Sequence, residues 1–460
     1  MNTVLSRPES QYDFVVPYNL IEERLDDDVD TERHKAHRGQ RFFKRSIRHY
    51  RHATTKWGAA LEGFAPMWFA ICISSGGLGS LLNGPFPYQG RWLEVLASIL
   101  YVVEVVTYVV FSGIMIARWI IYPHVAVRRA MNNPDELLAY AIPPIALMTI
   151  AALTATQVSN ASWGGHGWTL LAYVLWWIGC VWVFATALVV FPVLFHTGNQ
   201  ADRVMTPVLF MAPVGLATAG TEAGLITTRA CCMSARLADP MLVVGYFAVG
   251  VAIFMAIVLY TLYFHRLLAA GWTIPSKRPG LFILIGPCGQ LAAALQVLGL
   301  SAAGYNRFAD YKPTALQPPQ YGTFWTEQTA SGVQGAGILL ALLLLGFDFL
   351  WFGLAIIGVA EIFVKKQATY SLVWWSVVFP TVTVTTAILQ LSNSMDSPAF
   401  RGIYCALVVF IATVYIGNLG FTIRGIWNGS LIFGQTQAEV EDGIMKKAQD
   451  ELERKPTQSV

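Results

Sequence analysis

Residues 137–158 read LLAYAIPPIALMTIAALTATQV, an apolar run with the pair Pro143-Pro144 inside it. A bilayer core about 30 Å thick is crossed by roughly 20 apolar residues in a helix, so this run is long enough to span a membrane. Proline removes a backbone hydrogen bond and clashes with the preceding turn, so the helix should be interrupted at the pair. The stretch therefore predicts a membrane span with a broken backbone.

Ten apolar runs of this length occur along the 460-residue chain. They lie near residues 64–83, 92–118, 137–158, 168–192, 205–227, 241–265, 280–303, 332–362, 370–392 and 400–424. Each is too long for a strand of an outer-membrane barrel, and lipid offers no partner to exposed backbone groups. The sequence therefore predicts an all-α membrane protein with ten transmembrane helices.

The composition agrees with a membrane protein. Hydrophobic residues make up 55% of the chain and charged residues 13%, about half the share found in soluble domains. These values exclude a water-soluble, a disordered or a disulfide-rich chain. The net charge of +3 is too small to indicate a nucleic-acid partner, so the partner that the composition predicts is the lipid bilayer.

Helix breakers alternate along the ten runs. The odd-numbered runs contain Gly76-Gly77, Pro143-Pro144, Pro213, Gly286-Pro287 and Pro380, whereas the even-numbered runs lack interior proline apart from Pro192, at the end of the fourth. Proline and glycine are common in membrane helices, but strict alternation favours five helix-hairpin repeats. Because irregular backbone at membrane depth must face protein or water, the five broken helices should surround a central pore.

Small polar residues beside the breakers are candidates for lining this pore. The predicted pore residues are Ser74, Ser75, Gly76, Gly77, Pro143, Pro144, Pro213, Thr218, Thr221, Pro287, Gln290, Pro380, Thr381 and Thr383. Since Lys, Arg and His are absent at this depth, an anion would be held by hydroxyls, backbone amides and helix N-termini. Neither a metal site nor a haem or other cofactor is expected.

Three carboxylates lie well inside predicted spans: Glu104 in the second, Glu222 in the fifth and Asp348 in the eighth, whereas Glu94 and Glu361 lie near span ends. Intramembrane acids are functional candidates, here for proton coupling. For Glu104 and Asp348, which lie on unbroken helices, the alternative is a hydrogen-bonded strut between neighbouring helices. Glu222 lies on a broken helix and faces either the conduit or the surrounding protein.

The basic residues predict the orientation. Residues 33–56 carry nine Lys or Arg and no acid, which keeps this flank cytoplasmic. We therefore expect a disordered cytoplasmic segment at 1–60, a membrane domain at 61–425 and a cytoplasmic tail at 426–460. The sequon at Asn160 falls in an outside loop and is a candidate glycosylation site, whereas the sequon at Asn428 faces the cytoplasm.

One stretch of the first span resembles a known family. Phe64-Ala65-Pro66-Met67-Trp68-Phe69, followed by Ser74-Ser75-Gly76-Gly77, is similar to the opening helix of the tellurite-resistance/dicarboxylate transporter family. That family includes fungal malate transporters, fungal sulfite efflux pumps, bacterial tellurite-resistance proteins and plant slow anion channels. The resemblance covers residues 60–425. It implies five hairpins around a central pore, and a homotrimer as in the bacterial and plant members.

Two branches of the family compete. The stretches 277–282 and 395–400 resemble the malate transporters, whereas 86–93 and 286–290 resemble the sulfite pumps. The malate branch usually has a second proline after Pro287, where this chain has Cys288. An organic-acid carrier is favoured, and sulfite efflux or export of another small organic acid is the alternative.

The stretch 374–380 is similar to the family's ninth helix, and the family's pore-blocking phenylalanine falls on Phe379. The resemblance therefore implies a plasma-membrane transporter or channel for small anions, with Phe379 as its gate and C4-dicarboxylates such as malate as its substrates. An enzyme is not expected, because catalysis needs a cluster of titratable or metal-binding groups at one depth.

Overall fold

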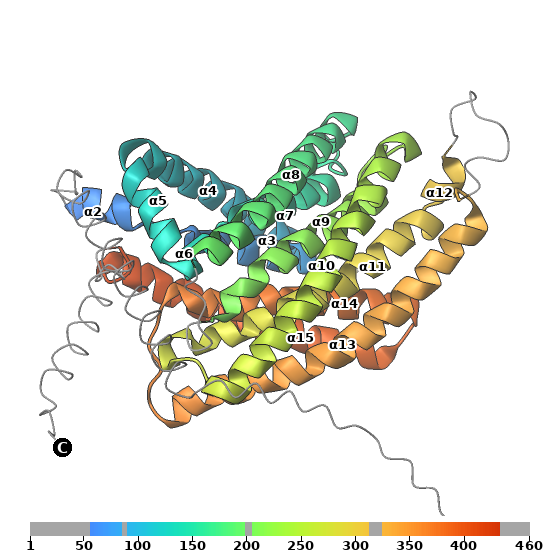
Figure 1. Ribbon diagram of the computed structural model, residues 1–460. Helices are drawn as coiled ribbons and strands as arrows, with labels where there is room; N and C mark the ends of the chain where they lie inside the picture. The colour runs from blue at the N-terminus through green and yellow to red at the C-terminus, as the bar shows by residue number, and fades with distance from the viewer. Residues whose placement is uncertain (1–55, 85–89, 198–204, 312–323, 433–460) are drawn as a thin grey trace, which may run out of the picture. The chain divides into compact units, whose positions relative to one another are not determined.

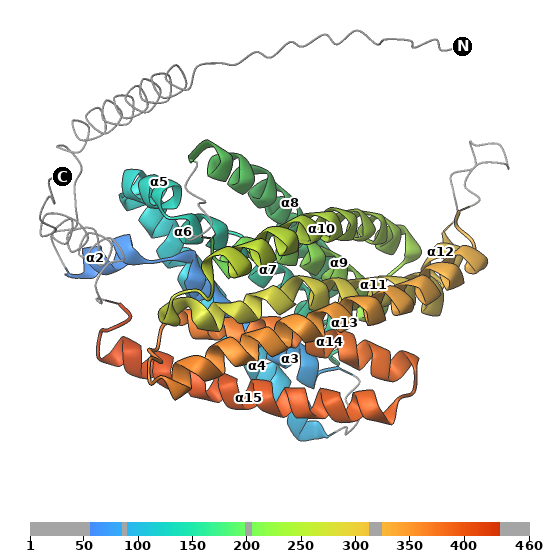
Figure 2. The ribbon, with the colours of Figure 1, turned by 60° about the horizontal axis from the view of Figure 1, so that its bottom comes forward.

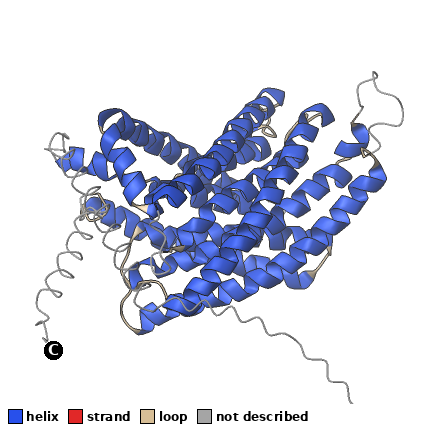
Figure 3. Cartoon of the chain, in the orientation of Figure 1, coloured by secondary structure: helices blue, strands red, loops and turns tan. Residues whose placement is uncertain are grey.

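A computed structural model of the chain describes residues 56–84, 90–197, 205–311 and 324–432. All regular structure in these ranges is helical (Figure 3). Nine of the described helices are long and apolar enough to cross a membrane. A bent pair, Trp57–Gly63 with Pro66–Leu82, brings the number to ten if it counts as one span. The all-α class is confirmed, and these helices match the ten apolar runs.

Five inner spans begin as a short helical segment and continue as an α-helix. They are η2 (Pro66–Phe69) with α3 (Ala70–Leu82); α6 (Pro134–Ala139) with α7 (Ile142–Leu153) and the π-helical η3 (Thr154–Val158); η4 (Pro207–Phe210) with α9 (Met211–Arg229); η5 (Pro275–Ile285) with α11 (Gly286–Gly304); and η6 (Leu372–Val377) with α14 (Val378–Ser394). The interruption predicted at each proline is therefore present, as a junction between two helical segments.

The prolines mark where α-helices start. Pro143 and Pro144 in α7, Pro213 in α9, Pro287 in α11 and Pro380 in α14 all lie within the first three residues of their helix. A residue in the first turn has no intrahelical acceptor for its N–H, so proline loses nothing there. The expected kinks are thus helix starts rather than bends.

Gly76 and Gly77 do not break a helix, contrary to the prediction. Helix α3 runs through both residues without interruption, and the break of this span lies upstream, where η2 with Pro66 joins α3. A Cβ on Gly77 would lie only 2.9 Å from Cγ1 of Val382 in α14. The glycine pair therefore serves close helix packing, because it removes the side chains that would hold α3 away from its neighbours.

Five longer helices form an outer layer. They are α4 (Arg91–Ile121), α8 (His166–Thr197), α10 (Ala235–Ala270), α13 (Glu327–Val364) and α15 (Pro398–Trp427). In their most apolar stretches only 6 to 39% of residues are buried, compared with 78 to 100% in four of the inner spans. Helix α10 starts earlier than the predicted run and therefore contains Pro240. The exposed apolar faces of the outer layer suit contact with lipid.

The inner α-helices close into a ring. In order, α3 contacts α7, α7 contacts α9, α9 contacts α11, α11 contacts α14, and α14 returns to α3. Each outer helix packs against the inner helix before it in the sequence and against the next one around the ring. Accordingly, α11 lies between α10 and α13 in Figure 1, and α14 lies between α13 and α15 in Figure 2. The five predicted hairpins around an axis are confirmed.

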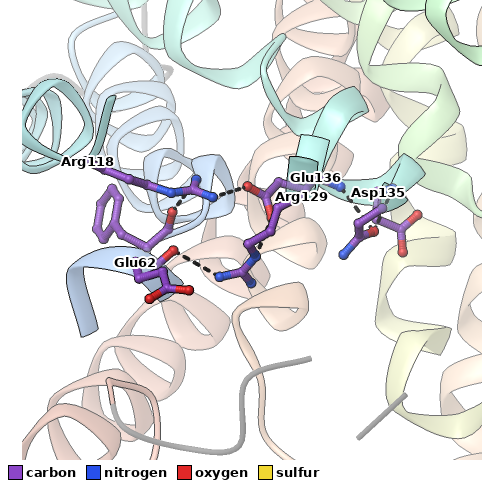
Figure 4. A network of polar contacts seen from close by, with 7 residues as sticks. Glu62, Arg118, Arg129, Asp135 and Glu136 are labelled. Carbon is purple, nitrogen blue, oxygen red and sulfur yellow. Dashed lines mark hydrogen bonds and ion pairs between the residues drawn. The ribbon is translucent and has the colours of Figure 1, made fainter. Parts of the chain in front are cut away.

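A buried ionic network joins the ends of several elements (Figure 4). Arg118 of α4 donates to the carbonyl of Phe64 at 2.7 Å and to the carboxylate of Glu136 in α6 at 2.6 Å. Arg129 of α5 (Pro123–Asn132) lies 3.3 Å from the same carboxylate and donates to the carbonyl of Glu62 in α2 (Lys56–Gly63) at 3.0 Å. The network fixes the start of the first inner span to the second hairpin.

The described helices begin and end close to the predicted domain boundaries. Helix α2 begins at Lys56, inside the segment expected to be disordered, and α15 continues to Trp427. Residues 1–55 and 433–460, with most of the predicted tails, lie outside the described residues.

Candidate functional site

A small cavity lies inside the ring of inner helices. Its volume is about 50 Å³, and α3, α7, α9, α11 and α14 all contribute to its wall. The polar residues that line it are Ser80, Thr149, Thr218, Thr221, Glu222, Gln290, Thr383 and Thr386. No Lys or Arg is among its described lining residues. This inner cavity has room for one or two water molecules, because a water in the liquid occupies about 30 Å³.

Phe379 lines the inner cavity at the end where the inner helices begin. It is the second residue of α14 and only 2% exposed. Farther along α14 the cavity is lined by Val382, Thr383 and Thr386. The aromatic ring therefore stands on the axis at one end of the polar segment.

Two donors in the inner cavity are free. The side-chain amide of Gln290 and the hydroxyl of Ser80 form no hydrogen bond with the described residues, although both line the cavity. In contrast, Thr218 donates to the carbonyl of Val214 at 2.8 Å, and Thr383 donates to that of Pro380 at 2.7 Å. Gln290 and Ser80 can therefore donate to a solute without first breaking a bond.

A larger cavity of about 700 Å³ lies at the other end of the axis, and we call it the vestibule. The residues that line it are Asn83, Gly84, Leu225, Thr228, Arg229, Val297, Leu300, Tyr305, Ser331, Gln334, Gly335, Ile338, Gln390, Asn393 and Ser394. Leu225 also lines the inner cavity, so the two spaces adjoin at this residue. Together they trace a route from Phe379 to the exposed end of α14.

Some predicted pore residues lie away from this route. Ser74, Ser75 and Thr381 line neither cavity. Ser75 is paired with the hydroxyl of Tyr415 in α15 at 2.9 Å, and Thr381 donates to the carbonyl of Val377 at 2.6 Å. The five prolines also line neither cavity and act only where the helices start. In this structure these residues therefore lie in the packed walls of the ring, and a place for them in an open pore stays a prediction.

Glu104 of α4 reaches the edge of the inner cavity from the outer layer. Its side chain is fully buried, and Thr149 of α7 donates to its Oε1. A Cβ on Gly76 would lie 2.2 Å from both carboxylate oxygens. Oε2 has no hydrogen-bond partner among the described atoms. Glu104 thus joins α4 to α7, as the strut alternative requires, and contacts two residues that line the cavity.

The other two acids differ in position. Glu222 of α9 faces the inner cavity, and its Oε2 has no hydrogen-bond partner among the described atoms. Asp348 of α13 is buried and lines neither cavity. Only Glu222 of the three acids is therefore in direct reach of a solute on the axis.

Asn160 lies at the vestibule end of the ring. Its exposed side-chain amide donates to the carbonyl of Arg229 at 2.8 Å and to that of Thr156 at 3.1 Å. The side chain therefore ties the loop after η3 to the end of α9. A glycan on Asn160 remains a prediction.

Sequence reasoning missed most of the vestibule wall and three polar residues of the inner cavity, Ser80, Thr149 and Thr386. Ser80 and Thr386 lie four and three residues from the predicted Gly76 and Thr383, so helical spacing alone would have found them. Thr149 and Arg229 had no such signal, because Thr149 is five residues beyond the predicted Pro144 and Arg229 was counted only as a loop charge.

A closed ring of helices around a polar axis, covered by helices that expose apolar faces, is the architecture of a membrane transport protein. Residues 63–423 match the model of the family described as voltage-dependent anion channel, and the chain belongs to this family. No cluster of His, Cys, Asp or Glu among the described residues could hold a metal ion.

Curated relatives agree in class. The chain is 23% identical over 396 residues to the "Putative malic acid transport protein" of Schizosaccharomyces pombe, covering 84% of this chain and 85% of the relative. It is 26% identical over 365 residues to the sulfite efflux pump of Arthroderma benhamiae, covering 77% and 91%. A malic acid transport protein of S. pombe is 21% identical over 342 residues, covering 74% and 73%. The relatives are transporters and pumps, so this chain is a transport protein and not an enzyme.

Proposed function

We propose that the chain carries small anions along the axis of the inner ring, with C4-dicarboxylates such as malate as substrates. The observation that carries this proposal is the route from Phe379 through the inner cavity to the vestibule, because polar side chains line both spaces. Gln290 and Ser80 supply free donors at its centre. Hydrogen-bond donors of this kind can replace part of an anion's hydration shell.

The parallel inner helices favour an anion at one end of the axis. All five begin at the Phe379 end, so their dipoles point the same way and place partial positive charge there. This arrangement draws an anion towards the inner cavity, although no Lys or Arg is among the described residues that line it. It also keeps cations away from the same segment.

Phe379 is the proposed gate. An inner cavity of about 50 Å³ cannot hold a C4-dicarboxylate, so the axis has to widen before the substrate passes. Phe379 is the largest side chain in contact with the cavity. Rotation of its ring away from the axis is the smallest change that would extend the open space past Phe379.

The proposed location is the plasma membrane, with both termini in the cytoplasm and the vestibule outside. The basic residues Arg118, Arg129, Lys277, Arg278 and Lys365 form ion pairs at the end opposite the vestibule, which fits the positive-inside rule. In this orientation the membrane potential favours anion export by about 2.3 kcal/mol per charge per 100 mV. A homotrimer is proposed from the family resemblance.

Sulfite efflux is the second candidate. The sulfite pump of A. benhamiae is as similar to this chain as the malate relatives are, and Cys288 stands where the malate branch has proline. Both substrates are small oxyanions that the same donors would bind.

The test is flux through the purified protein in liposomes. Malate and sulfite are compared at equal concentration, with empty liposomes as the control. Malate flux well above sulfite flux supports the organic-acid proposal, and the reverse order assigns the chain to sulfite efflux. If neither anion moves, even in a Phe379→Ala variant, the proposed route is wrong.

A further inference from the structure

The vestibule presents an electrostatic obstacle to an anion. Helices α3, α9, α11 and α14 all end around it, at Leu82, Arg229, Gly304 and Ser394. The last carbonyls of a helix lack intrahelical partners and carry partial negative charge. Four helix ends of this kind repel an anion that enters or leaves the axis, unless a cation offsets them.

Arg229 is the one charged residue among the described residues that line the vestibule. It is the last residue of α9, one turn beyond Leu225, which lines both the vestibule and the inner cavity. The guanidinium has no ion pair or hydrogen bond with the described residues. Its charge is therefore available to a solute at the point where the route narrows.

A neighbouring arginine is already engaged. Arg307 of α12 (Arg307–Asp310) donates to the carbonyl of Thr227 at 3.0 Å and to that of Met233 at 2.6 Å. It thus neutralises the end of α9 through backbone contacts and does not line the vestibule. The contrast assigns different tasks to the two arginines: Arg307 caps a helix, and Arg229 faces the open space.

The surroundings of Arg229 suit an oxyanion. The vestibule wall also carries the side-chain amides of Asn83, Gln334, Gln390 and Asn393. A guanidinium binds a carboxylate or similar oxyanion through two parallel N–H donors, and amide N–H groups can bind the remaining oxygens directly or through water. A volume of about 700 Å³ exceeds that of a small carboxylate, so the anion would keep part of its water and dissociate readily.

We propose that Arg229, with the surrounding amides, forms a docking site for small oxyanions at the vestibule end of the route. The site rests on the proposed transport function and deepens it, because it gives the anion a stage between solvent and the inner cavity. The docking site binds carboxylates and sulfite equally, so it determines the preference for oxyanions over other solutes. Selectivity among oxyanions is then determined in the inner cavity.

The first test needs no transport. The purified protein is treated with phenylglyoxal, which modifies free guanidinium groups, and labelling is mapped by mass spectrometry at rising malate or sulfite concentration. We expect either anion to slow the labelling of Arg229 at least threefold. Arg236, exposed on α10 and absent from the vestibule wall, is the internal control. Equal labelling of Arg229 with and without anion overturns the proposal.

The second test measures flux in liposomes with the anion supplied on the vestibule side. Arg229→Gln should raise the KM about tenfold, while Arg229→Lys, which keeps the charge, should raise it less. Arg236→Gln should match the wild type. An unchanged KM in Arg229→Gln overturns the docking site. Absence of flux in the wild type, with labelling still slowed by anions, overturns the transport function and leaves the binding site standing.

Discussion

Gly76 of α3 and Glu104 of α4 interlock: a Cβ on the glycine would lie 2.2 Å from both oxygens of the carboxylate. Gly76→Ala should therefore destabilise the protein by about 1–3 kcal/mol, the usual cost of overpacking a core. The measurement is the melting temperature in detergent, with flux as a second readout.

A double variant separates this contact from a general defect in α3. Glu104→Ala removes the side chain with which the new methyl group collides, so the Gly76→Ala/Glu104→Ala protein should be more stable than the sum of the single effects predicts. Gly77→Ala is the matched control, because its Cβ meets Val382 and not Glu104. Strictly additive effects at residues 76 and 104 would show that the two residues do not interact.

Removal of the Phe379 ring should raise flux. If the ring contributes about 1.4 kcal/mol to the barrier, Phe379→Ala increases the rate of anion flux about tenfold. Phe282→Ala is the control, because Phe282 is similarly buried but packs against Phe352 and lines neither cavity. Both variants should lose about 3–5 kcal/mol of stability. A rate that rises equally in both variants would point to loosening of the bundle and not to a gate.

Proton coupling, if present, should depend on Glu222 more than on the other intramembrane acids. Glu222 faces the inner cavity, whereas Asp348 lines neither cavity. We expect Glu222→Gln to abolish proton movement that accompanies malate uptake, measured with a pH-sensitive dye inside liposomes. Asp348→Asn should retain it. Uptake by the wild type without any proton movement would remove this role from Glu104, Glu222 and Asp348 together.

The ion network around Glu136 should be a main source of stability at its end of the bundle. Breaking a buried pair by removing one partner costs about 3–5 kcal/mol, and Arg118 is completely buried against Glu136 (Figure 4). Arg118→Ala should therefore lower the melting temperature far more than Arg128→Ala, since Arg128 is exposed on the adjacent α5. If Arg118→Ala lowered the melting temperature as little as Arg128→Ala does, the network would contribute no net stability.

The ring was predictable from the sequence, and part of the route was not. Proline always lacks a backbone N–H donor and therefore interrupts the hydrogen bonding of a membrane helix. For this reason Pro143, Pro213 and Pro380 located the interruptions correctly. Glycine can have either of two effects: it weakens a helix, or it allows a neighbouring helix to pack closely. The positions of Glu104 and Val382 show that the glycines of α3 allow close packing.

Arg229 illustrates a different limit. In the sequence it is a cation at the end of a span, indistinguishable from the other outside charges. Arg229 becomes a candidate binding residue because four helix ends converge around one cavity. That convergence results from the packing of segments that are far apart in the chain. A sequence pattern shows which face of a helix is apolar, but it does not show whether the opposite face lines a cavity.

The orientation of the axis can be tested with thiols at its two ends. Cys232 is exposed next to the end of α9, at the vestibule side, and Lys366 is exposed just beyond the end of α13, at the opposite side. In a Cys231→Ser background, which leaves one thiol at this loop, a membrane-impermeant maleimide applied to intact cells should label Cys232. A Lys366→Cys variant that also lacks Cys232 should be labelled only after the cells are permeabilised. The reverse pattern would place the vestibule in the cytoplasm. The membrane potential would then drive anions from the vestibule towards Phe379, so an anion would bind at Arg229 before it is exported.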